Sequence, residues 1–131
     1  MRGSYMLKTG FKELLAQANA VIETVSVQDL PYLQDDPDVV IVDVRDARER
    51  ESDGAIPGSI HASRGMLEFH ADPECPVHLP ALNPANRIVL FCGTGGRSAL
   101  AAKTLQDMGF SDVLSLAGGF AAWQAAKNGK G

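Results

Sequence analysis

Three short runs of branched apolar residues constrain the fold of this chain more than any other feature. They cover residues 39–44, 87–91 and 113–116, and each has the length of a single strand. A strand with one face in water alternates apolar and polar residues, whereas these runs are apolar almost throughout, which is typical of strands buried on both faces of a parallel sheet. We therefore expect an α/β fold, with a mainly parallel sheet of about five strands and helices on both faces.

The segments around these runs have the patterns of further strands and helices. Two short strands are predicted at residues 22–25 and 59–62. Capping signals begin two helices, because Asp46 and Glu49 have capping-box spacing and Ser98 stands where an N-cap would start the helix that follows. Further helices are predicted for the amphipathic stretch that begins at Phe11 and for residues 120–127, and the charged run 48–51 is interpreted as a solvated helix face.

The length and charge of the chain exclude several classes of protein. A chain of 131 residues can bury one core without disulfides or metal, and we expect an N-terminal helical extension over residues 1–20 and one domain over residues 21–131. The net charge is −4 and the twelve Lys and Arg residues form no basic stripe, so no nucleic-acid partner is expected. No apolar run has membrane-spanning length and no signal-peptide core is present, so no membrane partner and a cytoplasmic location are expected.

The two cysteines, Cys75 and Cys92, are not expected to form a structural disulfide in a reducing compartment. Cys75 lies in a proline-flanked loop, where it is either an incidental thiol or a resolving partner for Cys92. His70 and His78 lie close to Cys75 in sequence, but they lack the paired ligand spacing of a zinc site, so no metal is expected.

Cys92 directly follows a predicted buried strand and begins the segment Cys92-Gly93-Thr94-Gly95-Gly96-Arg97-Ser98. A helix start offers unpaired backbone N–H groups and a partial positive charge, and three glycines allow those groups to turn inward. This field stabilises a thiolate over a thiol, and Arg97 adds a permanent charge. An ordinary buried cysteine before a glycine turn is the alternative, but it explains neither the glycines nor the arginine.

Three separated segments together resemble the rhodanese-like domain family. Residues 42–49 with 54–60 are similar to the first signature of the family, residues 92–98 to its active-site loop, and residues 116–123 to its C-terminal signature. One departure is Ala55, which stands where the family often has histidine.

This resemblance implies a thiosulfate sulfurtransferase that carries sulfur as a persulfide on Cys92, the catalytic residue. The donor and the persulfide would be bound by the loop residues Gly93, Thr94, Gly95, Gly96, Arg97 and Ser98. Asp43 and Arg45 would form an internal ion pair that supports the site structurally. The implied partners are a small sulfur donor and a thiol or cyanide acceptor, with an acceptor protein as a further candidate, and no cofactor is implied.

Two alternatives remain open beside this reading. The same fold carries phosphatases and arsenate reductases with a cysteine and an arginine in one loop, but four residues separate Cys92 from Arg97, which is the sulfurtransferase length rather than the five of the phosphatases. No phosphatase activity is therefore expected. A non-enzymatic sulfur carrier or a regulatory interaction module is the second alternative.

Overall fold

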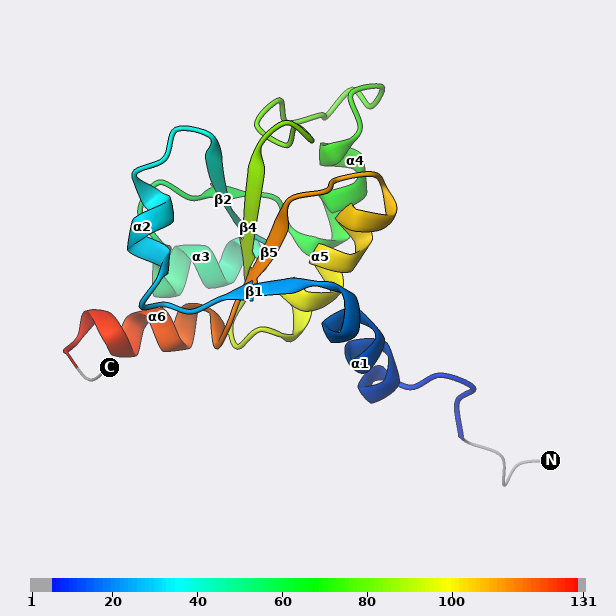
Figure 1. Cartoon of the computed structure of the whole chain (residues 1–131), viewed down its shortest axis with the longest axis horizontal. Helices are drawn as coiled ribbons and strands as arrows, with labels where there is room; N and C mark the ends of the chain where they lie inside the picture. The colour runs from blue at the N-terminus through cyan, green and yellow to red at the C-terminus, as the bar shows by residue number, and fades with distance from the viewer. Residues whose placement is uncertain (1–5, 130–131) are drawn as a thin grey trace.

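The computed structural model describes residues 6–129 and folds them around one central sheet (Figure 1). All strand pairs are parallel, and the strand order is β1-β5-β4-β2-β3. The elements, in chain order, are α1 (Phe11–Val21), β1 (Glu23–Val25), α2 (Leu30–Gln34), β2 (Val39–Asp43), α3 (Ala47–Asp53), β3 (Ile60–His61), the 3-10 turn η1 (Arg64–Met66), α4 (Leu67–Ala71), β4 (Arg87–Phe91), α5 (Gly96–Asp107), β5 (Val113–Leu116) and α6 (Gly119–Lys127). The expected α/β fold with a parallel five-stranded sheet is confirmed.

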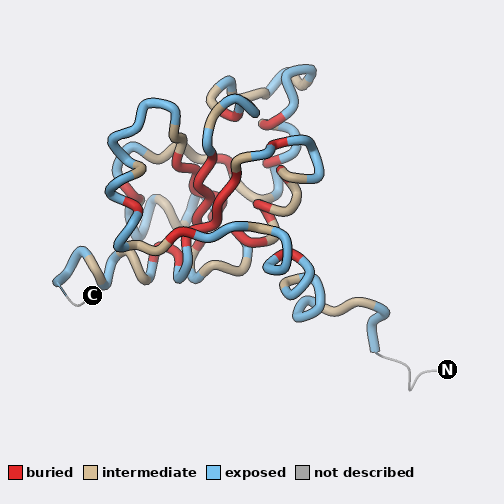
Figure 2. Tube along the Cα trace, in the orientation of Figure 1, coloured by how far each residue is buried: buried red, intermediate tan, exposed pale blue. Residues whose placement is uncertain are grey.

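Successive side chains of the central strand β4 point to opposite faces of the sheet, and each face has its own apolar core. Ile88 and Leu90 pack with residues of α4 and α5, whereas Val89 and Phe91 pack with residues of α2 and α6. Figure 1 shows these helices in two layers on either side of the sheet, and the buried residues of Figure 2 run along the strands between them. The prediction of helices on both faces is therefore confirmed.

After β2 the chain continues to one side of the sheet, and after β4 it continues to the other side. β3 lies beside β2 on one side, while β5 lies beside β4 on the other. In an open parallel sheet, the loops that follow two such strands separate and leave a crevice at the carboxyl edge. The loops after β2 and β4 therefore flank the place where this fold offers a binding site, and the second of them begins with Cys92.

A buried ion cluster at the carboxyl end of β2 holds one side of this crevice. The Asp43 and Arg45 side chains are 0% and 1% exposed, and Arg45 Nη2 donates to Asp43 Oδ2 at 2.9 Å. Arg50 from α3 adds a bond of 3.1 Å to the same oxygen. Burial by itself raises the pKa of Asp43, but the hydrogen bonds from both arginines outweigh it, so the pKa lies below its ordinary value.

The cluster also joins backbone segments that lie apart in sequence. Arg45 Nη2 donates to the Gly54 carbonyl at 2.7 Å, and Arg50 Nη2 donates to the Ser59 carbonyl at 2.7 Å. The Arg45 guanidinium also lies over the Phe120 ring, 4.3 Å from its centroid. The two arginines that pair with Asp43 thus link α3, the turn before β3 and the start of α6.

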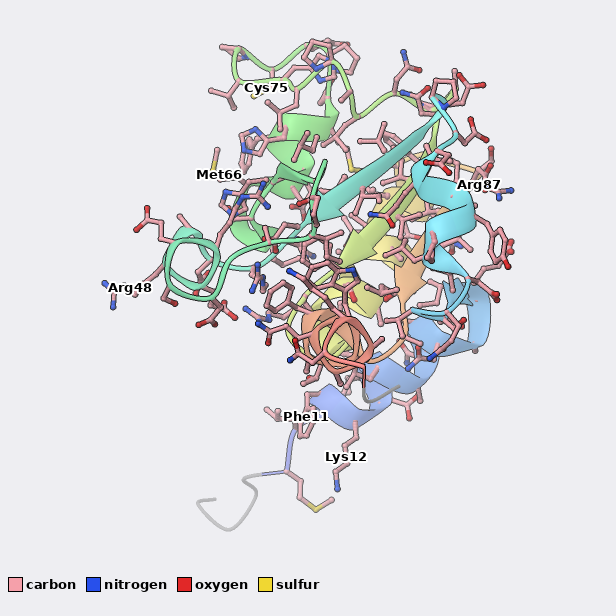
Figure 3. All side chains as sticks on the ribbon, turned by 90° about the vertical axis from the view of Figure 1, so that its left-hand side faces the viewer. Phe11, Lys12, Arg48, Met66, Cys75 and Arg87 are labelled. Carbon is pink, nitrogen blue, oxygen red and sulfur yellow. The ribbon has the colours of Figure 1, made fainter. Side chains whose placement is uncertain are left out.

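The N-terminal helix forms where it is predicted, but part of its apolar face is exposed. Phe11 is 67% and Leu14 is 43% exposed, and Ala18 is the one fully buried residue of α1. Phe11 and Lys12 point away from the rest of the molecule in Figure 3. The helix nevertheless packs against α5.

The boundary between residues 20 and 21 stays a prediction, and residues 1–5 and 130–131 of the two predicted segments lie outside the described residues. Within residues 6–129, no helix combines the length and the apolar character needed to cross a membrane.

We predict that Asp43→Asn lowers the free energy of unfolding by about 3–5 kcal/mol, because it leaves two arginines without their buried counter-charge. The matched control is Asp112→Asn, which breaks the Arg87–Asp112 pair, whose side chains are 44% and 45% exposed. That substitution should cost about 0–1 kcal/mol. Urea unfolding of both variants measures the difference, and equal losses would contradict a stabilising role for the buried cluster.

Candidate active site

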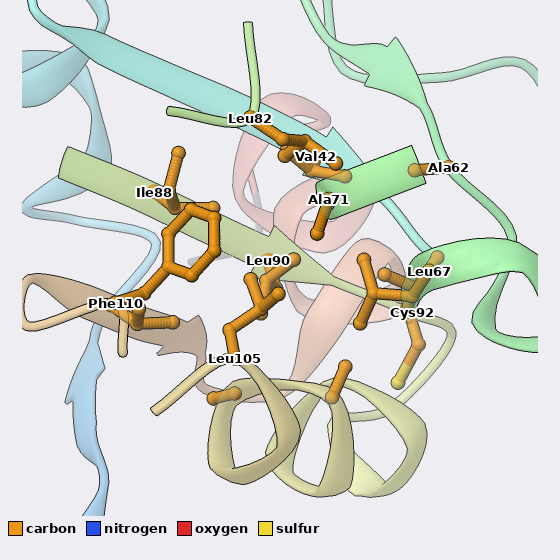
Figure 4. Packing of buried hydrophobic residues seen from close by; sticks show 14 residues of the cluster. Val42, Ala62, Leu67, Ala71, Leu82, Ile88, Leu90, Cys92, Leu105 and Phe110 are labelled. Carbon is orange, nitrogen blue, oxygen red and sulfur yellow. The ribbon is translucent and has the colours of Figure 1, made fainter. Parts of the chain in front are cut away.

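Cys92 lies at the carboxyl end of β4 and is only 1% exposed. Its sulfur accepts hydrogen bonds from two backbone amides, Gly95 N at 3.1 Å and Ser98 N at 3.3 Å. Figure 4 shows the residue among Leu67, Leu90 and the first turns of α5. The sulfur is therefore held inside the loop, at the N-terminus of a helix of 12 residues.

Gly95 makes this arrangement possible, because its backbone has φ +116°, in the left-handed region. It is the N-cap of α5, so the helix begins at Gly96 and includes Arg97 in its first turn. The prediction that Ser98 is the N-cap is wrong. The chain turns earlier, at a glycine, and this places the amide and the hydroxyl of Ser98 beside the sulfur.

The pKa of Cys92 is set by two opposed effects. Burial raises the pKa of the thiol, because a charged sulfur loses solvation. Hydrogen bonds from the Ser98 hydroxyl and from the amides of Ser98, Gly95 and Thr94 outweigh that effect, and the pKa lies below its ordinary value. The site therefore stabilises the thiolate relative to that of an ordinary cysteine.

A second buried hydroxyl lies behind Ser98. The Ser98 Oγ atom lies 3.6 Å from the sulfur, 3.2 Å from the Gly95 carbonyl oxygen and 2.7 Å from Ser115 Oγ. Ser115 belongs to β5 and is 2% exposed. Sequence reasoning missed this residue, although a single polar side chain in the apolar run 113–116 was a signal that it has a special contact.

Arg97 forms a bidentate ion pair across the crevice. Its Nη1 and Nη2 atoms donate to the two carboxylate oxygens of Glu49 on α3, at 2.7 and 3.0 Å. Hydrogen bonding by Arg97 is the main reason why the pKa of Glu49 falls to about 2, and the same pair raises the pKa of Arg97. The pair joins α3 and α5, the helices that follow the two strands flanking the crevice.

The interpretation of run 48–51 as a solvated face is therefore wrong for two of its residues. Arg48 and Glu51 are exposed, and Figure 3 shows Arg48 pointing outward. Glu49 and Arg50 instead reach partners in other segments, because they occupy the side of α3 that faces the crevice and β2. The capping-box spacing identified Glu49 for a local role, and its Oε1 does accept the Asp46 amide at 3.2 Å.

The backbone of the cysteine loop is held from the other side by α6. Phe120 N donates to the Cys92 carbonyl at 2.8 Å, and Ala121 N donates to the Gly93 carbonyl at 3.0 Å. Gly119 has φ +61°, and a Cβ atom there would lie 2.6 Å from the Cys92 carbonyl oxygen. The C-terminal glycine pair is thus in direct contact with the loop that carries the sulfur.

The remaining predicted site residues are distributed around this centre. The Thr94 side chain is exposed and lines a cleft of about 350 Å³, together with Gly95, Gly96 and Ser115. Asp43 and Arg45 bond to each other rather than to the cysteine loop through their side chains, although Val44 N donates to the Phe91 carbonyl next to Cys92.

The region around Cys75 forms no second site of this kind. Cys75 and Cys92 are both free thiols. His70 and His78 bond through ring nitrogens to the carbonyls of Val77 and His70, respectively. Across residues 6–129, the His, Cys, Asp and Glu side chains form no cluster able to hold a metal ion.

We predict that Gly119→Ala lowers the free energy of unfolding by more than about 2 kcal/mol, because it adds a collision with two carbonyl oxygens to the strain of a left-handed backbone. Gly109→Ala is the matched control, since that glycine has φ +110° with no atom near its missing Cβ. It should cost only about 1 kcal/mol. Thermal and urea unfolding measure both, and a control loss as large as that of Gly119→Ala would refute the close contact.

The Glu49–Arg97 pair predicts a pH dependence of stability. The folded pKa of Glu49, about 2, lies below its ordinary value of 4.5, so its stabilising contribution is present above pH 4.5 and is lost as the pH falls towards 2. The difference in unfolding free energy between the wild type and Glu49→Gln should therefore shrink over that range. Urea unfolding at successive pH values measures it. Glu51→Gln, at an exposed position of the same helix, leaves the Arg97 pair intact and is the matched control.

Comparison with known proteins covers most of the chain, including the loop that carries Cys92. The family model of the rhodanese-like domain matches residues 26–126. Thiosulfate sulfurtransferase GlpE of Pseudoalteromonas translucida is 37% identical over 106 residues, which cover 81% of this chain and 92% of that protein. The candidate sulfur carrier protein YrkF of Bacillus subtilis is 28% identical over 119 residues, or 91% of this chain and 60% of that protein.

Among solved structures, a protein from Rhodopseudomonas palustris CGA009 matches with a TM-score of 0.88 and 48% identity. The match covers 93% of this chain and 94% of that one, which is described as a protein of unknown function and a possible tyrosine phosphatase. The family match covers most of the chain and includes the cysteine loop, the buried ion cluster and the glycine pair of α6. This chain is a member of the rhodanese-like domain family.

Proposed function

We propose that this protein is a sulfurtransferase that moves a sulfane sulfur from a donor such as thiosulfate to a thiophilic acceptor, through a persulfide on Cys92. One observation carries the proposal: a buried cysteine sulfur accepts two backbone amides at the start of a helix. Such a site lowers the energy of an anionic sulfur, which is the form that attacks and the form that a persulfide takes at neutral pH.

In the first step, the Cys92 thiolate attacks the outer sulfur of thiosulfate. A bond forms between the two sulfur atoms, the bond from the outer sulfur to the sulfonate breaks, and its electron pair leaves with sulfite. The product is a Cys92 persulfide anion, so negative charge on the enzyme is conserved. The amides of Gly95 and Ser98 already point at the cysteine sulfur and require little rearrangement to stabilise this charge.

In the second step, cyanide or a thiolate attacks the terminal sulfur of the persulfide. The sulfur–sulfur bond breaks, its electron pair returns to Cys92, and thiocyanate or a new persulfide leaves. The thiolate is restored without any cofactor. The same loop therefore serves both half-reactions.

We assign Arg97 two functions in this scheme. Its charge at the rim attracts an anionic donor, and its two bonds to Glu49 hold the rim in place. Because Glu49 occupies both terminal nitrogens, the holding function dominates in the free protein. The ion pair of Asp43 and Arg45 supports the site by holding the end of β2 beside the cysteine loop.

A sulfur carrier is the second candidate, and the similarity to YrkF favours it. A carrier would keep Cys92 and its amide donors but pass sulfur to one partner protein rather than turn over with small molecules. A phosphatase is a weaker candidate. It rests on the description of the R. palustris relative, and the four-residue spacing of Cys92 and Arg97 opposes it.

We predict that thiosulfate adds one sulfur atom to the intact protein and that cyanide removes it as thiocyanate. Intact mass spectrometry measures the adduct, and thiocyanate formed in excess over protein distinguishes turnover from carriage. Cys92→Ala should lose the adduct completely, whereas Cys75→Ser should keep it.

The outcome that would contradict the proposal is specific. Absence of the adduct in wild-type protein that still alkylates at Cys92 would exclude persulfide chemistry with this donor. Hydrolysis of an aryl phosphate that disappears in Cys92→Ser would favour the phosphatase instead. An adduct without excess thiocyanate would favour the carrier.

A further inference from the structure

The Ser98 hydroxyl is surrounded by more acceptors than it can serve with its single proton. Its oxygen lies 3.2 Å from the Gly95 carbonyl oxygen, 3.6 Å from Cys92 Sγ and 2.7 Å from Ser115 Oγ. A hydroxyl donates one hydrogen bond and accepts up to two. Which neighbour receives the Ser98 proton therefore decides whether the sulfur has a hydroxyl donor.

Ser115 restricts this choice. It lies in the middle of β5, is 2% exposed, and has Ser98 Oγ as the one hydrogen-bond partner of its hydroxyl among residues 6–129. A buried hydroxyl that does not donate costs free energy, so the Ser115 proton belongs on Ser98 Oγ. Ser98 then accepts from Ser115 and keeps its own proton for either Gly95 or the sulfur.

We propose that Ser115 is a positioning residue for Cys92, whose hydroxyl donates to Ser98 and thereby directs the Ser98 proton to the cysteine sulfur when that sulfur is ionised. This inference rests on the proposed role of Cys92 as the nucleophile. It assigns a role at the site to a residue of β5, which lies outside the cysteine loop.

The hydrogen-bonding groups of Cys92, Ser98 and Ser115 are satisfied both when the cysteine is a thiol and when it is a thiolate. In the thiol form, Sγ–H donates to Ser98 Oγ, and Ser98 donates to the Gly95 carbonyl. When the cysteine loses its proton to solvent, the Ser98 hydroxyl rotates from Gly95 to the sulfur. Ser115 donates to Ser98 throughout, and a hydroxyl that accepts a hydrogen bond donates a stronger one, which favours the ionised form.

The other charged groups near the loop are the same in the Ser115 variants, so a shift in the titration between these variants reports the ionisation of Cys92. Arg97 and Glu49 face it from α5 and α3, with the pKa of Glu49 at about 2 and that of Arg97 raised. Asp43 and Arg45 are paired at the end of β2, with the pKa of Asp43 lowered. His61 of β3 bonds to the Arg45 carbonyl and is the same in every variant below.

The test is the pH midpoint of Cys92 alkylation by iodoacetamide, measured on the full chain with Cys75→Ser as background. Ser115→Thr and Ser115→Val form the decisive pair, because they have the same shape and differ in the hydroxyl. Ser115→Ala adds a smaller side chain without a hydroxyl.

The matched control is Thr24→Val. Thr24 is paired in register with Ser115 on the neighbouring strand β1 and lines the same cleft, so it lies on the same face of the sheet. It donates no hydrogen bond to Ser98. Thermal unfolding of each variant verifies that the fold is retained.

We expect Ser115→Val and Ser115→Ala to raise the pH midpoint of alkylation by about half a pH unit. Without the hydrogen bond from residue 115, the Ser98 hydroxyl donates a weaker hydrogen bond to the charged sulfur. Ser115→Thr and Thr24→Val should leave the midpoint unchanged, and Ser98→Ala should raise it further. Equal midpoints for the Thr and Val variants of Ser115 would overturn the proposal. Because alkylation needs no sulfur donor, a protein that forms no persulfide yet shows these shifts would refute the proposed function and leave the positioning role standing.

Discussion

The hydrogen bonds from two backbone amides to the sulfur of Cys92 are the interaction on which the rest of this site depends. A buried anion is stable only where fixed dipoles replace water, and here those dipoles come from the first turn of α5. The turn can form only because Gly95 adopts a left-handed backbone. Its position relative to the sulfur then has to be maintained from outside the loop.

Three contacts with distant segments maintain that position, and each comes from a different part of the fold. The amide of Phe120 on α6 binds the Cys92 carbonyl, Glu49 on α3 binds Arg97, and Ser115 on β5 binds the Ser98 hydroxyl. Together they surround the loop, so its amides stay directed at the sulfur before any substrate arrives. Such preorganisation is what makes electrostatic stabilisation effective in catalysis.

The prediction of the fold succeeded where the signal was local. The apolar runs, the glycine turns and the capping box at Asp46 are properties of neighbouring residues, and the strands and helices formed close to where they were expected. The prediction for the start of α5 failed, and the pattern of α1 did not show how much of its apolar face stays exposed. Periodicity at Phe11 does not reveal which face finds a partner, and an N-cap serine does not exclude an earlier start at Gly95.

The place of Cys92 before a helix start, and the glycine turn that directs amides at its sulfur, follow from the residues alone, because a strand, a cysteine, three glycines and a helix start are adjacent in the chain. The roles of Glu49 and Ser115 cannot be deduced from neighbouring residues, since these two residues lie 48 and 17 residues from their partners. Their side chains reach the loop only because a parallel sheet brings the ends of β2, β4 and β5 to one edge. The amide donors around the sulfur are thus encoded locally, and the groups that hold those donors in place are determined by the topology of the sheet.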